Sequence, residues 1–379
     1  MIGEILGGIL IGPSVLGRIA PHFFARLFPP ASLGSMESLS TVGLILFLFV
    51  IGSELDLDHL RQQKTTTLFS SLAGIIVPFS LAVASAPLLH ARFSPNGIGR
   101  IPFSLFLGVS MSITAFPVLA RILEEQNLQR SSLGATALLC AAVDDVAAWM
   151  LLAVAMTFVA YGGNGAGLYV RFLWLGAYVA VMFFFIRPLG RWVAARKSQD
   201  ALSYELLGLM VAVALASAAV TDAIGVHPLF GAFVAGLCFP RVPEWQQALR
   251  SRLETILSLV LLPLFFALTG LRTRLDLLSD ATIWLWTGFV LLLAVAGKMG
   301  GAILGARLAG QDWRTSIALG ALLNTRGLVE LIVLNIAYNA HVFSPTLFTM
   351  LVVMALVTTT ATVPILKCLR LPGEVSSTN

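Results

Sequence analysis

The sequence predicts an all-α polytopic membrane protein with about 12 transmembrane helices. Hydrophobic residues make up 58% of its 379 residues and charged residues only 11%, and the mean hydropathy is +0.90. Soluble domains carry about a quarter charged residues. This composition therefore excludes a soluble enzyme, a nucleic-acid-binding protein and a disordered chain. The apolar runs are continuous rather than alternating, which favours helices over a β-barrel.

Charged or Gly/Pro-rich stretches separate the apolar runs into successive segments of helix length. The expected helices are 2–17, 37–53, 66–90, 101–122, 132–159, 168–187, 202–221, 228–240, 254–271, 281–306, 315–338 and 346–366. The segment 228–240 is short for a crossing, so we expect it to be tilted or partly re-entrant.

The distribution of basic residues predicts how these helices are oriented. The chain has 24 Lys and Arg and a net charge of +5. If the N-terminus is cytoplasmic and the helices alternate, most of these residues fall in cytoplasmic loops, as the positive-inside rule requires. We therefore expect both termini in the cytoplasm, a multi-pass protein of the cell membrane (the inner membrane in a bacterium), and a short tail at 371–379. Because the first segment has an acid at Glu4 and no basic residues before its apolar run, we expect no secretory signal peptide. Its three cysteines form no Cys-x-x-Cys motif, so we expect no structural metal or disulfide.

A few ionisable residues lie deep inside the expected helices. They are Asp144, Asp145, Lys298, Arg326 and Glu330. Charges at membrane depth are costly and mark pathways for ions or protons. Adjacent helical residues lie about 100° apart, so Asp144 and Asp145 cannot share one proton and must face different partners. We expect one of them to pair with Lys298 and the other to face a cavity.

Two of the expected helices are interrupted near their centres. One reads SITAFPVLARIL and carries Thr114 and Pro117; the other carries Asn324, Thr325, Arg326 and Gly327. Irregular backbone at this depth is tolerated only inside protein or beside water. Each interrupted helix is the middle of a triple, the first of 66–90, 101–122 and 132–159, the second of 281–306, 315–338 and 346–366. The two triples begin on opposite sides of the membrane, which predicts inverted repeats around a midplane ion site.

Other polar residues have less specific interpretations. Arg326 and Glu330 share a helix face, which favours a structural ion pair, and a cation there would also offset the partial charges of broken helix ends. Asp222 and His227 frame a turn and are second-tier candidates. Glu54, Asp56 and Asp58 follow a helix end, where a solvated loop or an acidic vestibule is expected.

The motifs resemble those of monovalent cation:proton antiporters of the second superfamily branch, which includes Kef-type proteins, NapA-like sodium/hydrogen exchangers and plant cation/proton exchangers. The matching stretches are GEILGGILIGPSVLG, SITAFPVLARIL, AAVDDVAAWMLLAV, HPLFGAFVAG, LPLFFALTGLRT, GKMGGAILGAR and NTRGLVELIVLNIA. They run from residue 3 to about 340. Kef proteins tend to have Gln-Asp at the Asp144-Asp145 position and carry a C-terminal nucleotide-binding domain.

The resemblance implies one transmembrane antiporter domain over 1–370. A core of about 66–159 and 281–366, with two crossed discontinuous helices, would move against a dimerisation scaffold of about 1–60 and 202–271, with 168–187 as a linker. Relatives usually have a further helix before GEILGGILIGPSVLG, so we expect the family's first helix to be absent or the chain to start late. The resemblance also implies a homodimer in the lipid bilayer, no nucleic acid and no cofactor beyond the transported ions.

The resemblance also assigns roles to residues of the site. Asp145 would be the main carrier of the ion and the proton, and Asp144 would pair with Lys298. Thr114 and the backbone of Ala115, Phe116 and Pro117 would help to coordinate the dehydrated cation.

The expected function is exchange of Na⁺ or K⁺ for protons by alternating access, with both ions competing for Asp145. A cation channel or uniporter would use the same acidic site but would need a continuous pore. An intramembrane aspartyl protease would need two Asp on different helices. An organic-anion transporter fits less well, because Lys298 lies beside two acids.

Overall fold

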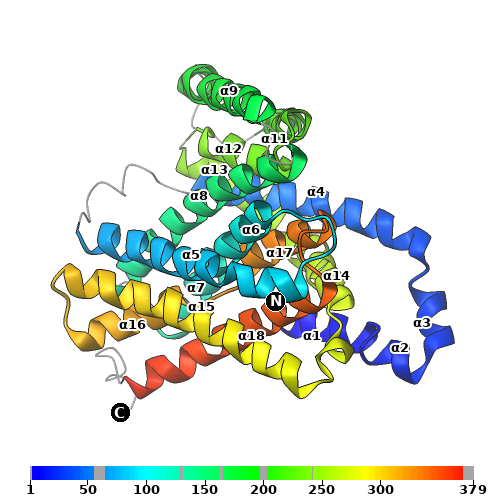
Figure 1. The fold of residues 1–379 in the computed structure, drawn as a ribbon. Coiled ribbons are helices and arrows are strands. Elements are labelled where there is room, and N and C mark those ends of the chain that lie inside the picture. Colours follow the sequence, from blue (N-terminus) through cyan, green and yellow to red (C-terminus); the bar gives the residue numbers. More distant parts are fainter. Residues whose placement is uncertain are drawn as a thin grey trace, which may run out of the picture. The chain divides into compact units, whose positions relative to one another are not determined.

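The computed structural model describes residues 2–54, 65–128, 131–161, 165–196, 203–240 and 242–369, and within these ranges the elements are all helices (Figure 1). The chain divides into two compact units. Unit 1 comprises Met1–Ile2, Leu57–Ala155 and Arg272–Asn379, and unit 2 comprises Gly3–Asp56 and Met156–Leu271.

Unit 1 is built mainly from two groups of helices. The first group is α5 (Thr66–Phe93), α6 (Arg100–Ser112), α7 (Phe116–Glu125) and α8 (Ser132–Tyr161), the last of which continues into unit 2. The second group is a 3₁₀ turn η4 (Leu275–Leu278), α15 (Ala281–Leu308), α16 (Trp313–Leu323), α17 (Leu328–Asn339) and α18 (Pro345–Cys368). In Figure 1, α5 and α15 run side by side.

Glycines allow α15 to lie very close to α5. A Cβ added at Gly301 would lie 2.5 Å from the carbonyl oxygen of Ala73, and one added at Gly297 would lie 2.8 Å from Cα of Pro78. A buried apolar cluster that includes Leu119, Leu319 and Leu323 packs other helices of the unit together. This close packing brings Lys298, which lies between the two glycines on α15, against the backbone of α5.

Side chains cap several helices of unit 1 at their N-termini. The carboxylate of Asp312 accepts a hydrogen bond from the backbone N–H of Thr315 at the start of α16, and the hydroxyl of Ser344 accepts one from Leu347 in α18. Such caps satisfy N–H groups that have no partner within the helix. Hydrogen bonds from Thr315 also hold the pKa of Asp312 below its usual value.

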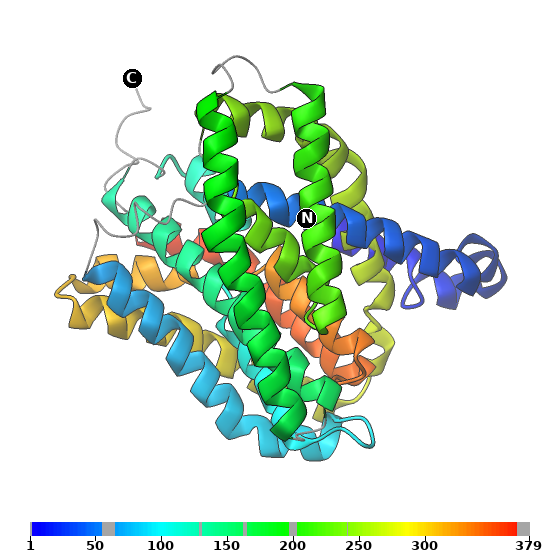
Figure 2. The same ribbon diagram turned by 90° about the horizontal axis from the view of Figure 1, so that it is seen from above.

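Unit 2 contains the helices on either side of the unit 1 segment 57–155. They are α1 (Ile2–Ile11), α2 (Leu16–Ile19), α3 (Pro21–Leu27), α4 (Pro30–Glu54), α9 (Gly165–Val181), η2 (Met182–Ile186), α10 (Arg187–Arg196), α11 (Tyr204–Ile224), α12 (Pro228–Leu237), α13 (Pro243–Ile256), η3 (Leu257–Leu261) and α14 (Leu262–Arg272). Figure 2 shows the continuous helix α9–η2–α10 and helix α11, both green, next to each other. The hydroxyl groups of Tyr178 in α9 and Ser217 in α11 lie 2.6 Å apart and join them.

The expected all-helical membrane architecture is confirmed. Nine helical stretches in the described residues are long and apolar enough to cross a membrane, and the bent pair α16–α17 makes a tenth if it is one span. The other two expected segments correspond to the pair α6–α7 and to the short helix α12. Twelve crossings, like the inverted repeats, stay a prediction.

Several expected boundaries are wrong. The segment 2–17 is not one helix: α1 ends at Ile11, because Pro13 lacks the N–H that would continue the helix and its ring clashes with the preceding turn. The segments 168–187 and 254–271 are parts of longer helical stretches that reach Arg196 and begin at Pro243. Their extensions, α10 and α13, are rich in charged residues, so hydropathy alone does not mark them as part of the same helices.

Candidate functional site

The two interruptions expected from the sequence lie against each other in unit 1. Residues Ile113–Ala115 separate α6 from α7, and Asn324–Gly327 separate α16 from α17, which are bent by 45°. The backbone N–H of Ala115 donates to the carbonyl of Thr325 at 2.9 Å. Pro117 lies in the first turn of α7, where proline is well tolerated because that N–H has no helical partner. This main-chain hydrogen bond thus joins two groups that regular helices would have used internally.

Asp144 lies beside this crossing. Its Oδ2 is 2.6 Å from the Thr114 hydroxyl and 2.6 Å from Nζ of Lys298. The Thr114 hydroxyl is also 2.8 Å from the carbonyl oxygen of Leu323, and its single proton can be donated to either acceptor. Asp144 and Lys298 are both buried. Their ion pair therefore joins the first interrupted helix, α8 and α15 at one point.

Lys298 has hydrogen-bond acceptors besides the carboxylate. Its ammonium donates to the carbonyl of Gly74 in α5 at 3.0 Å and to the carbonyl of Ser112, the last residue of α6. Three acceptors match the three donors of a lysine ammonium. These two acceptors are not predictable from residue type, since main-chain carbonyls carry no side-chain signature.

Asp145 has a different environment from its neighbour. It is 1% exposed, and neither carboxylate oxygen has a hydrogen-bond partner in the described part of the chain. Oδ1 of Asp144 and Oδ1 of Asn324 are also buried without a partner there. A buried carboxyl in this state is costly unless it is protonated or holds a cation.

Arg326 connects the second interruption to the end of α6. Its Nη1 donates to the carbonyl of Ser110 at 2.7 Å and its Nη2 to that of Met111 at 2.8 Å. Nη1 also lies 3.2 Å from Oε1 of Glu330, and both side chains of this pair are fully buried. The guanidinium thus places positive charge on carbonyls at the C-terminal end of a half-helix, where the helix dipole is negative. Thr359 in α18 supports the same turn: its hydroxyl donates to the Arg326 carbonyl at 2.6 Å.

The second-tier candidates belong to unit 2, whereas the residues above belong to unit 1. Asp222 lies in the last turn of α11, where its carbonyl accepts from Gly225 N–H. His227 caps α12 by accepting from Leu229 N–H at 3.4 Å. Glu54 ends α4 and lies 3.6 Å from Nη1 of Arg250. Asp56 and Asp58 lie outside the described residues.

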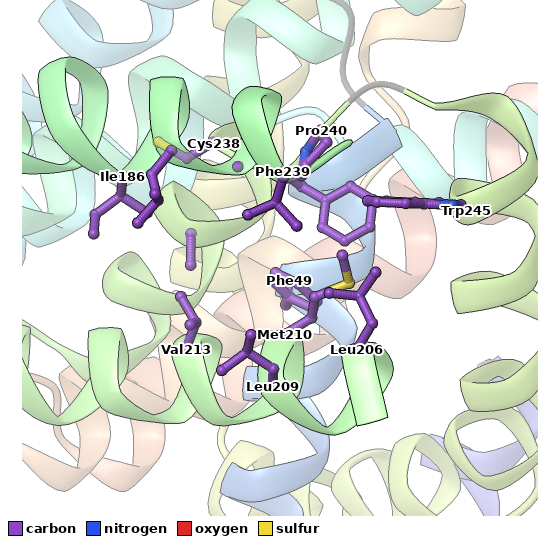
Figure 3. Close-up of a pocket in the computed structure, with 14 residues that line it drawn as sticks. Phe49, Ile186, Leu206, Leu209, Met210, Val213, Cys238, Phe239, Pro240 and Trp245 are labelled. Atoms are coloured by element: carbon purple, nitrogen blue, oxygen red, sulfur yellow. The ribbon is translucent and has the colours of Figure 1, made fainter. Parts of the chain in front are cut away.

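Unit 2 contains an apolar cavity of about 160 Å³ (Figure 3). Phe49 from α4, Met210 from α11 and Trp245 from α13 are among its lining residues, and the lining carries no ionisable side chain other than the thiol of Cys238. Such a cavity offers nothing to hold a dehydrated cation. Among the described residues, no cluster of three or more His, Cys, Asp or Glu could bind a metal.

Comparison with known proteins shows what the chain is similar to. The model of the family described as "Sodium/hydrogen exchanger, transmembrane" matches residues 1–368. Cation/H(+) antiporter 20 of Arabidopsis thaliana is 41% identical over 386 residues, covering 99% of this chain and 46% of the relative. Na(+)/H(+) antiporter NhaS4 of Synechocystis is 39% identical over 367 residues, covering 96% of this chain and 89% of the relative.

K(+)/H(+) antiporter 1 of Saccharomyces cerevisiae is 34% identical over 373 residues, covering 96% of this chain and 43% of the relative. The chain therefore spans about half the length of the plant and yeast relatives and most of the length of the cyanobacterial one.

Proposed function

Because the chain belongs to the sodium/hydrogen exchanger family, we propose that it exchanges a monovalent cation for protons across a membrane. The family is one of transporters rather than enzymes, and the chain is an integral multi-pass membrane protein. The cation is Na⁺ or K⁺: the cyanobacterial relative is named for Na⁺ and the yeast relative for K⁺. Carboxylate, hydroxyl and carbonyl oxygens of the kind gathered around the crossing suit either ion.

The observation that carries this proposal is the environment of Asp145. A buried carboxyl without a hydrogen-bond partner can be neutralised by a proton or by a monovalent cation, but not by both at once. Competition for one carboxyl couples the two ions, because the neutral loaded site can change its accessibility while the bare charged site cannot cheaply do so.

Asp144 and Lys298 have a supporting role in this proposal. Their 2.6 Å ion pair keeps Asp144 occupied while Asp145 is protonated. When a cation enters, it attracts both carboxylates, and Lys298 releases Asp144. If Lys298 also loses its proton at this step, two protons move for each cation and exchange becomes electrogenic.

Unit 1 carries the whole of this site, and we assign it the part of the moving core, around 66–159 and 281–366. Unit 2 would be the scaffold, with 1–60 and 202–271 forming the surface of a homodimer and 168–187 acting as a linker. Movement of the core relative to the scaffold would expose the site first to one side of the membrane and then to the other.

The test replaces Asp145 with asparagine, which keeps the size of the side chain but cannot be charged. In proteoliposomes with an imposed Na⁺ or K⁺ gradient, the unmodified chain is expected to drive uphill proton movement. Asp145→Asn should abolish this movement at every pH from about 6 to 9, since no buried carboxyl remains at that position to bind either ion. The control is Asp280→Asn, which changes an exposed carboxylate at the N-terminus of α15 and should leave exchange unchanged, because asparagine caps a helix as well.

Two results would contradict the proposal. Exchange by Asp145→Asn at the rate of the unmodified chain would remove the residue from the carrier role. A cation flux that never drives protons uphill would mean passive conduction rather than antiport.

A further inference from the structure

We propose that Pro78 is a positioning residue of the ion site, because it leaves the Gly74 carbonyl free to hold Lys298. Pro78 lies inside α5, four residues after Gly74. In a regular helix the N–H of residue 78 would donate to the carbonyl of residue 74. Proline has no N–H, so this carbonyl is released from the helix.

The released carbonyl has a specific partner. It accepts a hydrogen bond from Nζ of Lys298 at 3.0 Å, although 224 positions separate the two residues in the sequence. Gly74, Pro78 and Lys298 are all buried. A buried carbonyl without a donor costs about 1–3 kcal/mol of stability. The Lys298 ammonium supplies that donor, and the Gly74 carbonyl supplies an acceptor for the buried ammonium.

The approach of α15 depends on the same proline. Gly297, immediately before Lys298, packs against Pro78, where an added Cβ would lie 2.8 Å from the proline Cα. Gly297 has no side chain, so α15 can lie close to α5 at Pro78. This close approach sets how far the Lys298 side chain reaches toward the Gly74 carbonyl. No hydrogen bond joins Pro78 to either aspartate in the described part of the chain, so Pro78 acts through Lys298.

A second released carbonyl completes the pattern. Ser112 ends α6, and the break that follows leaves its carbonyl without the helical donor of residue 116. The ammonium of Lys298 is therefore bound by one carboxylate and by two carbonyls released from helices, one by a proline and one by a helix break. This inference rests on the proposed function: the carbonyls offer Lys298 a place to remain when an entering cation takes Asp144.

The first experiment measures the thermal stability of the purified full chain and does not depend on transport. Lys298→Met removes the ammonium and leaves the Gly74 carbonyl without a donor, whereas Pro78→Ala supplies a new N–H to that carbonyl. Pro78→Ala should therefore raise the melting temperature about 2–4 °C more in the Lys298→Met background than in the unmodified chain. Equal shifts in the two backgrounds would overturn the proposal.

The same helix offers a matched control. Pro87 also lies inside α5, and it releases the carbonyl of Val83, whose side chain is exposed. Pro87→Ala likewise adds a backbone N–H to α5, but at a carbonyl that is not a partner of Lys298. It should therefore shift the melting temperature equally in both backgrounds. The melting-temperature shift of Pro87→Ala could instead differ between the two backgrounds as much as that of Pro78→Ala does. That result would mean a general effect of proline on the helix and would overturn the assignment.

The second experiment measures transport in proteoliposomes. In Pro78→Ala the new backbone N–H also donates to the Gly74 carbonyl, so the Lys298 ammonium binds Asp144 more strongly. An entering cation then competes less well with Lys298 for Asp144. Pro78→Ala should raise the KM for the cation about three- to tenfold and change the maximal rate less than twofold, while Pro87→Ala leaves KM unchanged. An unchanged KM in Pro78→Ala would remove the residue from the exchange cycle. Failure of the proposed function itself appears separately, as exchange that survives Asp145→Asn.

Discussion

At the scale of single residues, the two neighbouring aspartates of the site have different hydrogen-bond environments. Asp144 and Asp145 are adjacent and equally buried, yet only Asp144 has a lysine and a hydroxyl within hydrogen-bond distance. The difference follows from helix geometry, since neighbouring side chains point about 100° apart. One carboxylate is thereby held in a network, while the other has no hydrogen-bond partner in the described part of the chain.

Three Arg-Glu ion pairs with a spacing of four residues lie in the described part of the chain, and two of them permit a direct comparison. The pair Arg326–Glu330 is fully buried, and its guanidinium also bonds two carbonyls of α6. The pair Arg121–Glu125 is exposed, with side chains 78% and 55% accessible. The two pairs differ in burial rather than in chemistry.

We expect Arg326→Lys to destabilise the protein by about 1.5–3 kcal/mol, because one ammonium cannot reach both carbonyls and Glu330 as a planar guanidinium does. Arg121→Lys, the control, should change stability by at most about 0.5 kcal/mol, since exposed pairs contribute little. Thermal or denaturant unfolding in detergent measures both. Similar losses for the two variants would mean that the contacts of Arg326 with α6 do not stabilise the fold.

At the scale of the helix, the pair α5–α15 holds the site in place. Gly301 faces α5, where an added Cβ would meet the Ala73 carbonyl at 2.5 Å, while the neighbouring Gly300 has no atom within 4 Å of such a Cβ. Two glycines one position apart therefore have opposite requirements.

Gly301→Ala should cost about 1–3 kcal/mol of stability, because the backbones must separate to admit the methyl group. It should also reduce exchange, since α15 carries Lys298. Gly300→Ala should be neutral or stabilising by up to about 1 kcal/mol, as expected for alanine in an open helical position. Unfolding and proteoliposome transport compare the two variants. Equal stability would show that α5 and α15 separate at no cost.

At the scale of the whole molecule, the distribution of basic residues in the sequence predicts the orientation of the chain in the membrane. The positive-inside rule predicts that both termini are cytoplasmic. The location of the C-terminal end of α18 can be tested by thiol labelling, because Cys368 is exposed there, whereas Cys140 and Cys238 are buried.

A membrane-impermeant maleimide should label Cys368 in inside-out vesicles or permeabilised cells but not in intact cells. Cys368→Ser provides the blank, because the buried thiols should not react. Labelling of intact cells at Cys368 would place the end of α18 outside and reverse the predicted topology.

The amino-acid sequence by itself determined the all-helical membrane class, the positions of the two interruptions and the unusual buried charges. These features are local: apolar runs, a proline and polar residues within them are readable without any contact between distant segments. The break at Pro13 was missed, although a local signal was present, and the lengths of α10 and α13 were missed because charged residues there continue helices beyond the apolar run.

Only the tertiary structure decided which groups meet. Lys298 reaches the Gly74 and Ser112 carbonyls, and Arg326 reaches those of Ser110 and Met111, across 186 or more positions of sequence. Every residue has a main-chain carbonyl, so residue type does not predict which carbonyls accept a hydrogen bond from Lys298 or Arg326. They become available where a proline or a break releases them, and they become partners only when close helix packing brings a buried cation to that point.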